Sequence, residues 1–132
     1  MADPKTTLTG KAAVLEGFGD HPAITAIEGW NGEAITDAKF DRGELSLTID
    51  KDQIRGACSA LLAGGYNAFQ DVTAVDWFPS VPRFQVVYHA CSHKHKDVVR
   101  LKVLVDEGDL SVDSITPVWP GANYYEREIF DL

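Results

Sequence analysis

Residues 50 to 65 read Asp50-Lys-Asp-Gln53-Ile54-Arg-Gly-Ala57-Cys58-Ser-Ala-Leu61-Leu62-Ala-Gly64-Gly65, and they carry the clearest helical pattern in the chain. Their apolar side chains recur at i, i+3, i+4, i+7 and i+8, the spacing that lines one face of an α-helix. Asp50 can cap this helix with Gln53 at the third helical position, and the glycine pair ends it. The stretch therefore predicts a helix with one apolar face, which another element must cover.

Segments typical of β-strands lie on both sides of this helix. Leu45, Leu47 and Ile49 alternate with polar residues, and Arg42-Gly43 before them favours a hairpin turn. The segments after the helix are rich in β-branched and aromatic residues. The sequence predicts strands over residues 33–40, 44–49, 66–76, 83–91 and 98–105, and a short first helix over residues 7–18.

The last fourteen residues read Trp119-Pro-Gly-Ala-Asn123-Tyr124-Tyr125-Glu126-Arg127-Glu128-Ile-Phe-Asp131-Leu132. Asn123 is a suitable N-cap, so a final helix is predicted from about Tyr124. On that helix Glu126 and Glu128 point about 200° apart, which disfavours a pair of carboxylates converging on one substrate. Aromatic side chains beside charges are instead typical of protein interfaces.

The predicted elements follow the order α-β-β-α-β-β-β-α. This order indicates the α+β class, with a two-layer α/β sandwich and a sheet of about five strands. A chain of 132 residues with 45% apolar content is long enough for one compact core, so residues 1–132 are expected to form a single domain.

Composition narrows the classes of partner. The formal net charge of -8 repels phosphate backbones and anionic lipids, which argues against nucleic-acid binding and direct membrane adhesion. No apolar run approaches the ~20 residues needed to cross a bilayer, and the start at Met1 lacks the apolar region of a secretory signal. The chain is therefore expected to be soluble and to stay in the cytoplasm.

Cys91-Ser-His93-Lys-His95 is the only local cluster that suggests a metal site. Alternate residues of an extended strand point to one side, so a thiolate and two imidazoles could ligate zinc there. Zinc normally takes four ligands, and Lys94 and Lys96 suit an exposed hairpin tip, so the hairpin is favoured. With only two cysteines, Cys58 and Cys91 are predicted to be thiols rather than a disulfide.

Other motifs that hold cofactors are missing from the sequence. Gly17-Phe-Gly19 lacks a third glycine and a preceding strand, so it does not predict a phosphate-binding loop. There is no Gly-x-Ser-x-Gly elbow and no cysteine run suited to an iron-sulfur cluster. Asp71 and Asp76 flank a strand, where acidic residues more commonly form turns or ion pairs than catalyse. The chain is therefore predicted to contain no catalytic, cofactor or metal site.

The segment Tyr-Glu-Arg-Glu-x-x-Asp-Leu, residues 125–132, resembles the closing signature of the 30 kDa subunit of NADH-quinone oxidoreductase, which is respiratory complex I. Further blocks match in order and approximate spacing. They are Asp71-Val-Thr-Ala-Val-Asp76-Trp77, Arg83-Phe-Gln-Val-Val-Tyr88-His89, Arg100-Leu-Lys102-Val103 and Trp119-Pro. Family members usually continue past Asp-Leu with Phe-Gly and a further tail, whereas this sequence ends at Leu132, so the contacts of that tail are left open.

The resemblance implies a mixed sheet and a non-catalytic docking role in the peripheral arm of a proton-translocating complex, on the cytoplasmic side of the inner membrane. It implies contact with the large hydrogenase-related subunit that helps form the quinone site and with neighbouring iron-sulfur subunits. NADH, FMN, iron-sulfur clusters and quinone would be bound by these partners. By analogy, the residues that would make or brace the contact are Tyr124, Tyr125, Glu126, Arg127, Glu128 and Asp131, with Asp71, Asp76 and Trp77 nearby.

Two alternatives remain at the level of sequence. Similar domains occur in membrane-bound hydrogenases and in complexes linked to cofactor F420 or ferredoxin, and only the neighbouring subunits would separate these machines. The other alternative is a stand-alone small enzyme or metal-binding protein that uses Cys91, His93 and His95.

Overall fold

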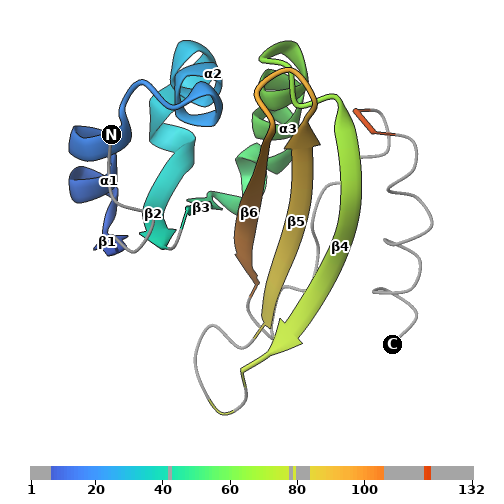
Figure 1. Cartoon of the computed structure of the whole chain (residues 1–132). Helices are drawn as coiled ribbons and strands as arrows, with labels where there is room; N and C mark the ends of the chain where they lie inside the picture. The colour runs from blue at the N-terminus through green and yellow to red at the C-terminus, as the bar shows by residue number, and fades with distance from the viewer. Residues whose placement is uncertain (1–6, 42, 78, 80–83, 106–117, 120–132) are drawn as a thin grey trace.

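The structure is a computed structural model, and it describes residues 7–41, 43–77, 79, 84–105 and 118–119. These residues form one six-stranded sheet and three α-helices (Figure 1). The strands are β1 (Thr7–Thr9), β2 (Ile35–Asp41), β3 (Glu44–Ile49), β4 (Ala68–Asp76), β5 (Phe84–Ser92) and β6 (Asp97–Val105). The helices are α1 (Lys11–Phe18), α2 (Pro22–Asn31) and α3 (Ile54–Ala63), with 3-10 turns at Gly32–Ala34 and Lys51–Gln53.

The strand order is β1-β2-β3-β6-β5-β4. Strands β3 and β6 pair in parallel, and the other neighbouring pairs are antiparallel. A parallel pair needs a long crossover connection, and here α3, β4 and β5 lie between the two strands in the chain. The sheet is therefore mixed, as the sequence resemblance implied.

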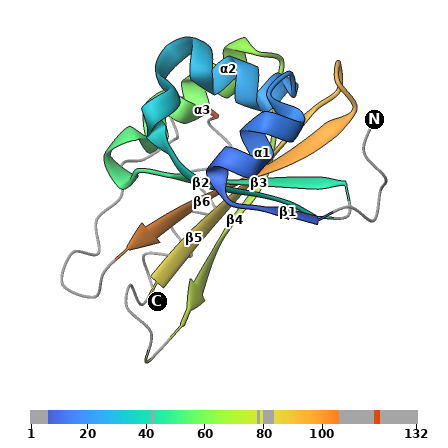
Figure 2. The same cartoon turned by 90° about the vertical axis from the view of Figure 1, so that its left-hand side faces the viewer.

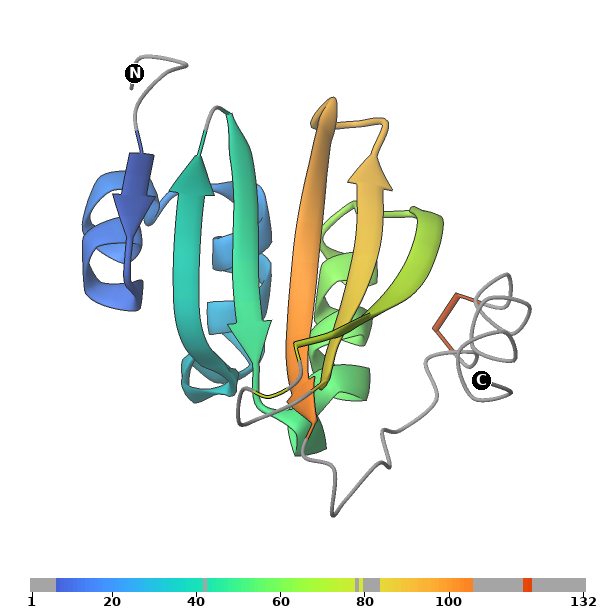
Figure 3. The same ribbon diagram turned by 90° about the horizontal axis from the view of Figure 1, so that it is seen from below.

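All three helices lie on one face of the sheet (Figures 2 and 3). Alternate residues of β3 and β6 point into the core between the layers, and α2 and α3 supply the opposing side chains. The largest of these buried side chains are Ile24, Ile27, Leu45, Leu47, Ile49, Ile54, Leu61 and Leu101. This arrangement confirms the predicted two-layer α/β sandwich. None of the helices in the described residues covers the other face of the sheet, which we call the open face.

The start of the chain differs from the sequence-based expectation. The predicted helix over residues 7–18 begins only at Lys11, because Thr7–Thr9 pairs with β2 as strand β1. Gly10 joins strand to helix with a φ of 102°, a conformation that L-residues with a side chain disfavour. Strand β1 raises the strand number to six, one above the approximate five.

Helix α2 was not predicted from the sequence. Pro22 stands at its first turn, where its fixed φ favours helix initiation and its missing N–H costs nothing. The cap is His21, whose Nδ1 accepts the N–H of Ala23 at 3.1 Å. Histidine is not among the usual capping residues, so the signal for this helix start is weak in the sequence.

The glycine end predicted for α3 is confirmed, but the α-helix starts only at Ile54, with Gln53 as its N-cap and no side-chain hydrogen bond from that residue. Asp50 Oδ1 accepts the N–H of Asp52 at 3.2 Å, although the first turn after it is a 3-10 turn. At the other end the N–H of Gly64 reaches the carbonyls of Ala60 and Leu61, and Gly65 adopts a φ of +104°. The helix predicted from about Tyr124 lies outside the described residues.

Gly56 lets α2 and α3 pack closely, and this contact gives a first prediction. A Cβ at Gly56 would lie 2.2 Å from Cζ2 of Trp30, so the indole ring would have to move. We expect Gly56→Ala to lower the free energy of unfolding by about 1 to 3 kcal/mol through this overlap, despite a gain of ~1 kcal/mol in helix propensity. Urea unfolding measures the change.

The control is the same substitution in a Trp30→Ala background. There the overlap is gone, so Gly56→Ala should be neutral or stabilising. Equal destabilisation in both backgrounds would show that overlap with the Trp30 ring is not the cause.

Candidate functional site

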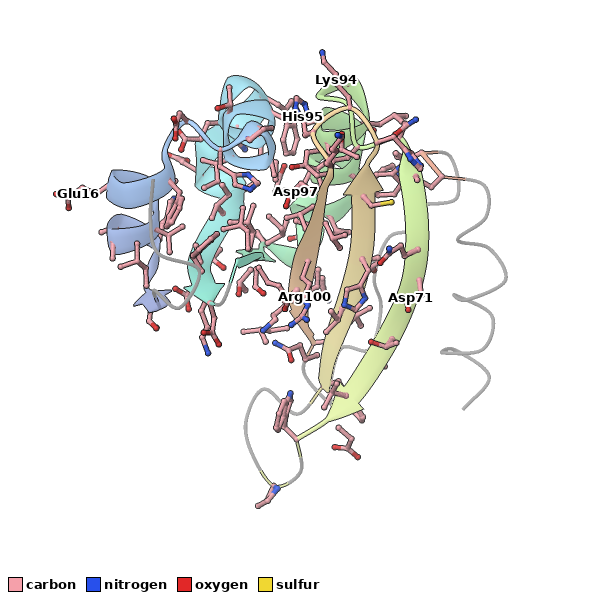
Figure 4. The ribbon with its side chains drawn as sticks, viewed as in Figure 1. Glu16, Asp71, Lys94, His95, Asp97 and Arg100 are labelled. Carbon is pink, nitrogen blue, oxygen red and sulfur yellow. The ribbon has the colours of Figure 1, made fainter. Side chains whose placement is uncertain are left out.

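Asp71 lies on β4, the strand at one edge of the sheet, and its side chain faces β5 on the open face (Figure 4). Its Oδ1 is 2.6 Å from Nδ1 of His89, its register partner on β5. The Asp71 side chain is 42% exposed, so the carboxylate reaches solvent while it orients the imidazole. Asp71 thus belongs to an ion pair or charge-assisted hydrogen bond, the role that the sequence favoured over catalysis.

Asp76 and Trp77 stand at the end of β4. Asp76 is the last residue of the strand and faces Phe84 in the register with β5. Trp77 is 52% exposed, and its Nε1 donates to Oε1 of Gln85 at 3.2 Å. An indole that is exposed but held at its polar end loses little conformational freedom on binding, which is typical of a residue that anchors an interface.

Trp119 has a different role. It is buried, and its Nε1 donates to the carbonyl of Tyr66 at 3.2 Å. The structure therefore places Trp119 in the core. The other predicted contact residues, Tyr124, Tyr125, Glu126, Arg127, Glu128 and Asp131, lie outside the described residues.

The Cys91, His93 and His95 segment forms the end of a hairpin. Cys91 is still in β5, opposite Val98, and residues 93–96 form the turn before β6. His95 turns toward the end of α3, where its Nε2 is 2.9 Å from the carbonyl oxygen of Gly64. Its imidazole is therefore engaged with the backbone, and within the described residues no group of three or more Cys, His, Asp or Glu side chains is placed to hold a metal ion.

The structure also brings together His21, Tyr66 and Asp97, which sequence reasoning did not connect. Asp97 Oδ2 accepts the Tyr66 hydroxyl at 2.7 Å and lies 3.1 Å from Nε2 of His21. Because Nδ1 of His21 accepts a backbone N–H, the neutral ring carries its proton on Nε2 and donates it to Asp97. The three side chains link the start of α2, the loop between α3 and β4, and the start of β6.

Burial and hydrogen bonding shift two pKa values in this network. Burial and the hydrogen bond to Asp97 raise the pKa of Tyr66 far above its usual range. Burial alone would raise the pKa of Asp97, but the hydrogen bonds from His21 and Tyr66 outweigh it, and the pKa falls below its ordinary value. A neutral tyrosine and an ionised aspartate are therefore the stable forms, and their hydrogen bond ties the segment after α3 to the start of β6.

Among the described residues, no helix is both long enough and apolar enough to span a membrane.

Comparison with known proteins points to one family. Residues 47–132 match the family described as respiratory-chain NADH dehydrogenase, 30 kDa subunit. A subunit of NADH-quinone oxidoreductase from Citrifermentans bemidjiense is 38% identical over 111 residues, which cover 83% of this chain and 69% of that relative. The same subunit from Geotalea uraniireducens is 41% identical over 75% of this chain and 61% of its own length. The chain thus spans about three-fifths to two-thirds of such relatives.

Solved structures agree on the fold. A trypsin-resistant fragment of Nqo5 superposes with a TM-score of 0.64 at 26% identity, covering 67% of this chain and 74% of the fragment. A chain of the membrane-bound sulfane sulfur reductase, an archaeal respiratory membrane complex, gives a TM-score of 0.70 at 21% identity over 83% of this chain and 64% of its own. The second likeness concerns the fold alone.

Proposed function

Because the chain belongs to the respiratory-chain NADH dehydrogenase 30 kDa subunit family, we propose that it is a docking subunit of a proton-translocating NADH-quinone oxidoreductase. The observation that carries the proposal is the family match over residues 47–132, which includes α3 and strands β4 to β6. Relatives named as subunits of that enzyme, 38–41% identical, support it. The complex as a whole would carry electrons from NADH to quinone.

The proposed contribution of this chain is orientation rather than catalysis. Its candidate residues are engaged in structural contacts: Asp71 with His89, Trp77 with Gln85, and Asp97 with Tyr66 and His21. A sheet that packs on three helices is stiff, so it can fix a partner whose redox centres must keep their spacing. NADH, FMN, iron-sulfur clusters and quinone would then be bound by neighbouring subunits.

The proposed position is in the peripheral arm, on the cytoplasmic side of the inner membrane. The chain, as a single domain, would bind chiefly the large hydrogenase-related subunit and lie near the iron-sulfur subunits. Trp77, with Asp76 next to it and Asp71 further back along β4, offers an exposed anchor at one edge of the sheet. The C-terminal residues Tyr124, Tyr125, Glu126, Arg127, Glu128 and Asp131 complete the proposed contact.

A related role in another machine is the second candidate. The sulfane sulfur reductase complex contains a chain of the same fold, so the fold alone suits a docking subunit in related membrane complexes. The identity of the subunits that bind this chain separates the two possibilities.

Replacing Arg127 with Ala is predicted to weaken assembly of the complex while the isolated domain keeps its stability. Arginine carries five donors in a planar fork, so its loss removes charged hydrogen bonds that another subunit would accept. The measurement is the amount of the variant that co-purifies with the other subunits from solubilised membranes.

Lys94→Ala is the matched control, because Lys94 is a cation exposed in the β5–β6 turn. It should assemble like the unmodified chain. Unchanged co-purification of Arg127→Ala would count against a contact through the C-terminal segment.

A further inference from the structure

The open face of the sheet carries an ordered group of polar side chains. Register pairing places Ser46 of β3 between Lys39 of β2 and Arg100 of β6, and it places Thr48 of β3 beside Lys102 of β6. The neighbouring residues of β6 that point the other way, Val99, Leu101 and Val103, are buried under the helices. Figure 3 shows this face in front of the helices. The group is called the Lys102 cluster, and it consists of Lys39, Ser46, Thr48, Arg100 and Lys102.

Several other charged residues on this face have partners within the chain. Arg100 Nη2 lies 2.6 Å from Oε2 of Glu44, and His89 Nδ1 lies 2.6 Å from Oδ1 of Asp71. Asp37, which pairs with Thr48 in the register, uses Oδ1 to accept the N–H of Ala38 at 2.8 Å. Among the described residues, no carboxylate lies within ion-pair distance of Lys102.

Two further cations, Arg100 and Lys39, lie near Lys102. Burial first, and then the charges of these two cations, lower the pKa of Lys102, whereas Asp37 acts in the opposite direction. The three cations gather on one face of a chain whose formal net charge is -8. A carboxylate brought to this point would relieve the repulsion between the cations, and the partly exposed Thr48 hydroxyl could donate a hydrogen bond to it.

Apolar side chains stand at both ends of the same strand face. Val98 is 40% exposed and Leu104 is 45% exposed, and both point to the open face like Arg100 and Lys102. A partner that covered the cluster would remove these side chains from water as well. Burial of apolar area contributes about 25 cal/mol per Å² in addition to the electrostatic attraction.

We propose that the open face of the sheet, centred on Lys102, is a docking surface for an acidic segment of a partner protein. The segment offers a carboxylate to the Lys102 cluster and apolar residues to Val98 and Leu104. A nucleic acid fits poorly, because it brings a charged phosphate at every nucleotide, and Asp37, Glu44 and Asp71 on the same face would repel the phosphates that lie beyond the cluster. A segment with a single carboxylate can place it at Lys102 and meet the rest of the face with apolar side chains. The inference rests on the proposed function, because it takes the partner to be another subunit of the same complex.

A zero-length crosslinking experiment on the intact, solubilised complex tests the proposal. A water-soluble carbodiimide joins a lysine amine to a carboxylate only when the two are in contact. Peptide mass spectrometry should find Lys102 or Lys39 joined to an Asp or Glu of another subunit. Crosslinks of both lysines only to carboxylates of this chain would overturn the proposal.

A charge reversal gives an independent test. Lys102→Glu should weaken incorporation of the chain into the complex at least tenfold, because a like charge would face the partner's carboxylate. Lys94→Glu makes the same change of net charge at the exposed β5–β6 turn and should incorporate normally. Equal incorporation of the two variants would overturn the proposal, provided that urea unfolding shows both to be folded.

Failure of this inference differs from failure of the proposed function. If the unmodified chain is absent from the purified complex, the proposed function is wrong. If the chain is present and Lys102 reacts with an acylating reagent as fast as in the isolated chain, the proposed function stands. The proposal that a partner covers Lys102 is then wrong.

Discussion

Leu101→Ala is expected to lower the free energy of unfolding by about 2 to 5 kcal/mol. Leu101 lies in the middle of β6 and is 1% exposed, opposite Leu47 of β3 in the parallel pair. Truncation removes contacts with both strands and with the helical layer, and the rigid surroundings leave a cavity. Urea unfolding followed by circular dichroism measures the effect.

The matched control is Leu104→Ala, the same chemical change on the same strand. Leu104 points to the open face and is 45% exposed, so its truncation should cost less than about 1 kcal/mol in the isolated chain. Because side chains alternate along a strand, a shift of register by one residue would exchange the two results. A larger loss for Leu104→Ala than for Leu101→Ala would therefore contradict the pairing of β3 with β6.

Asp97→Ala is expected to have the second-largest effect, a loss of about 2 to 4 kcal/mol in the free energy of unfolding. The substitution removes the acceptor for Tyr66 and the partner of His21 at once. Tyr66 is fully buried, so its hydroxyl would remain without an acceptor away from water. Thermal and urea unfolding of the purified chain measure the loss.

A double-mutant cycle separates this network from general damage. In a Tyr66→Phe background the hydroxyl is already gone, so Asp97→Ala should cost less than it does in the unmodified chain. Additive losses would show that the hydroxyl and the carboxylate do not interact.

The network of His21, Tyr66 and Asp97 also predicts how the free energy of unfolding depends on pH. The pKa of Asp97 is lowered from 3.8 in the folded chain, so its ionised form stabilises the fold above that value. This contribution is lost as the pH falls below about 4 and through the lower folded pKa. The free energy of unfolding of the unmodified chain should therefore fall more steeply with acid than that of Asp97→Asn. Parallel pH profiles would contradict this assignment.

Sequence patterns predicted the elements whose signals are local. The alternation of Leu45, Leu47 and Ile49 placed β3 at its observed bounds, and the Gly64-Gly65 signal placed the C-terminal end of α3. The Asp50 signal instead marks the 3-10 turn that precedes this helix. Strand β1 has only three residues, and its pairing with β2 depends on tertiary contact. Helix α2 was missed because its cap is a histidine. The available signals were Pro22 and the spacing of three apolar residues. These residues, Ala23, Ile24 and Ile27, are buried in the structure.

Candidate residues were harder to interpret than elements. Asp71 was expected to form a turn or an ion pair, but its partner His89 is eighteen residues away and meets it only through the β4–β5 register. Tyr66, Asp97 and His21 come from three separate segments, and nothing in their sequence spacing relates them. The Lys102 cluster likewise depends on β3 and β6 pairing in parallel, a contact between strands separated by α3, β4 and β5.

The central claim is that this chain is a docking subunit of an NADH-quinone oxidoreductase. The most direct test is affinity purification from solubilised membranes of the source cell, with this chain as bait and mass spectrometry as readout. The account predicts recovery of the large quinone-site subunit together with the NADH-oxidising subunits. Recovery of a hydrogenase set without NADH-oxidising subunits, or of no partner at all, would contradict it.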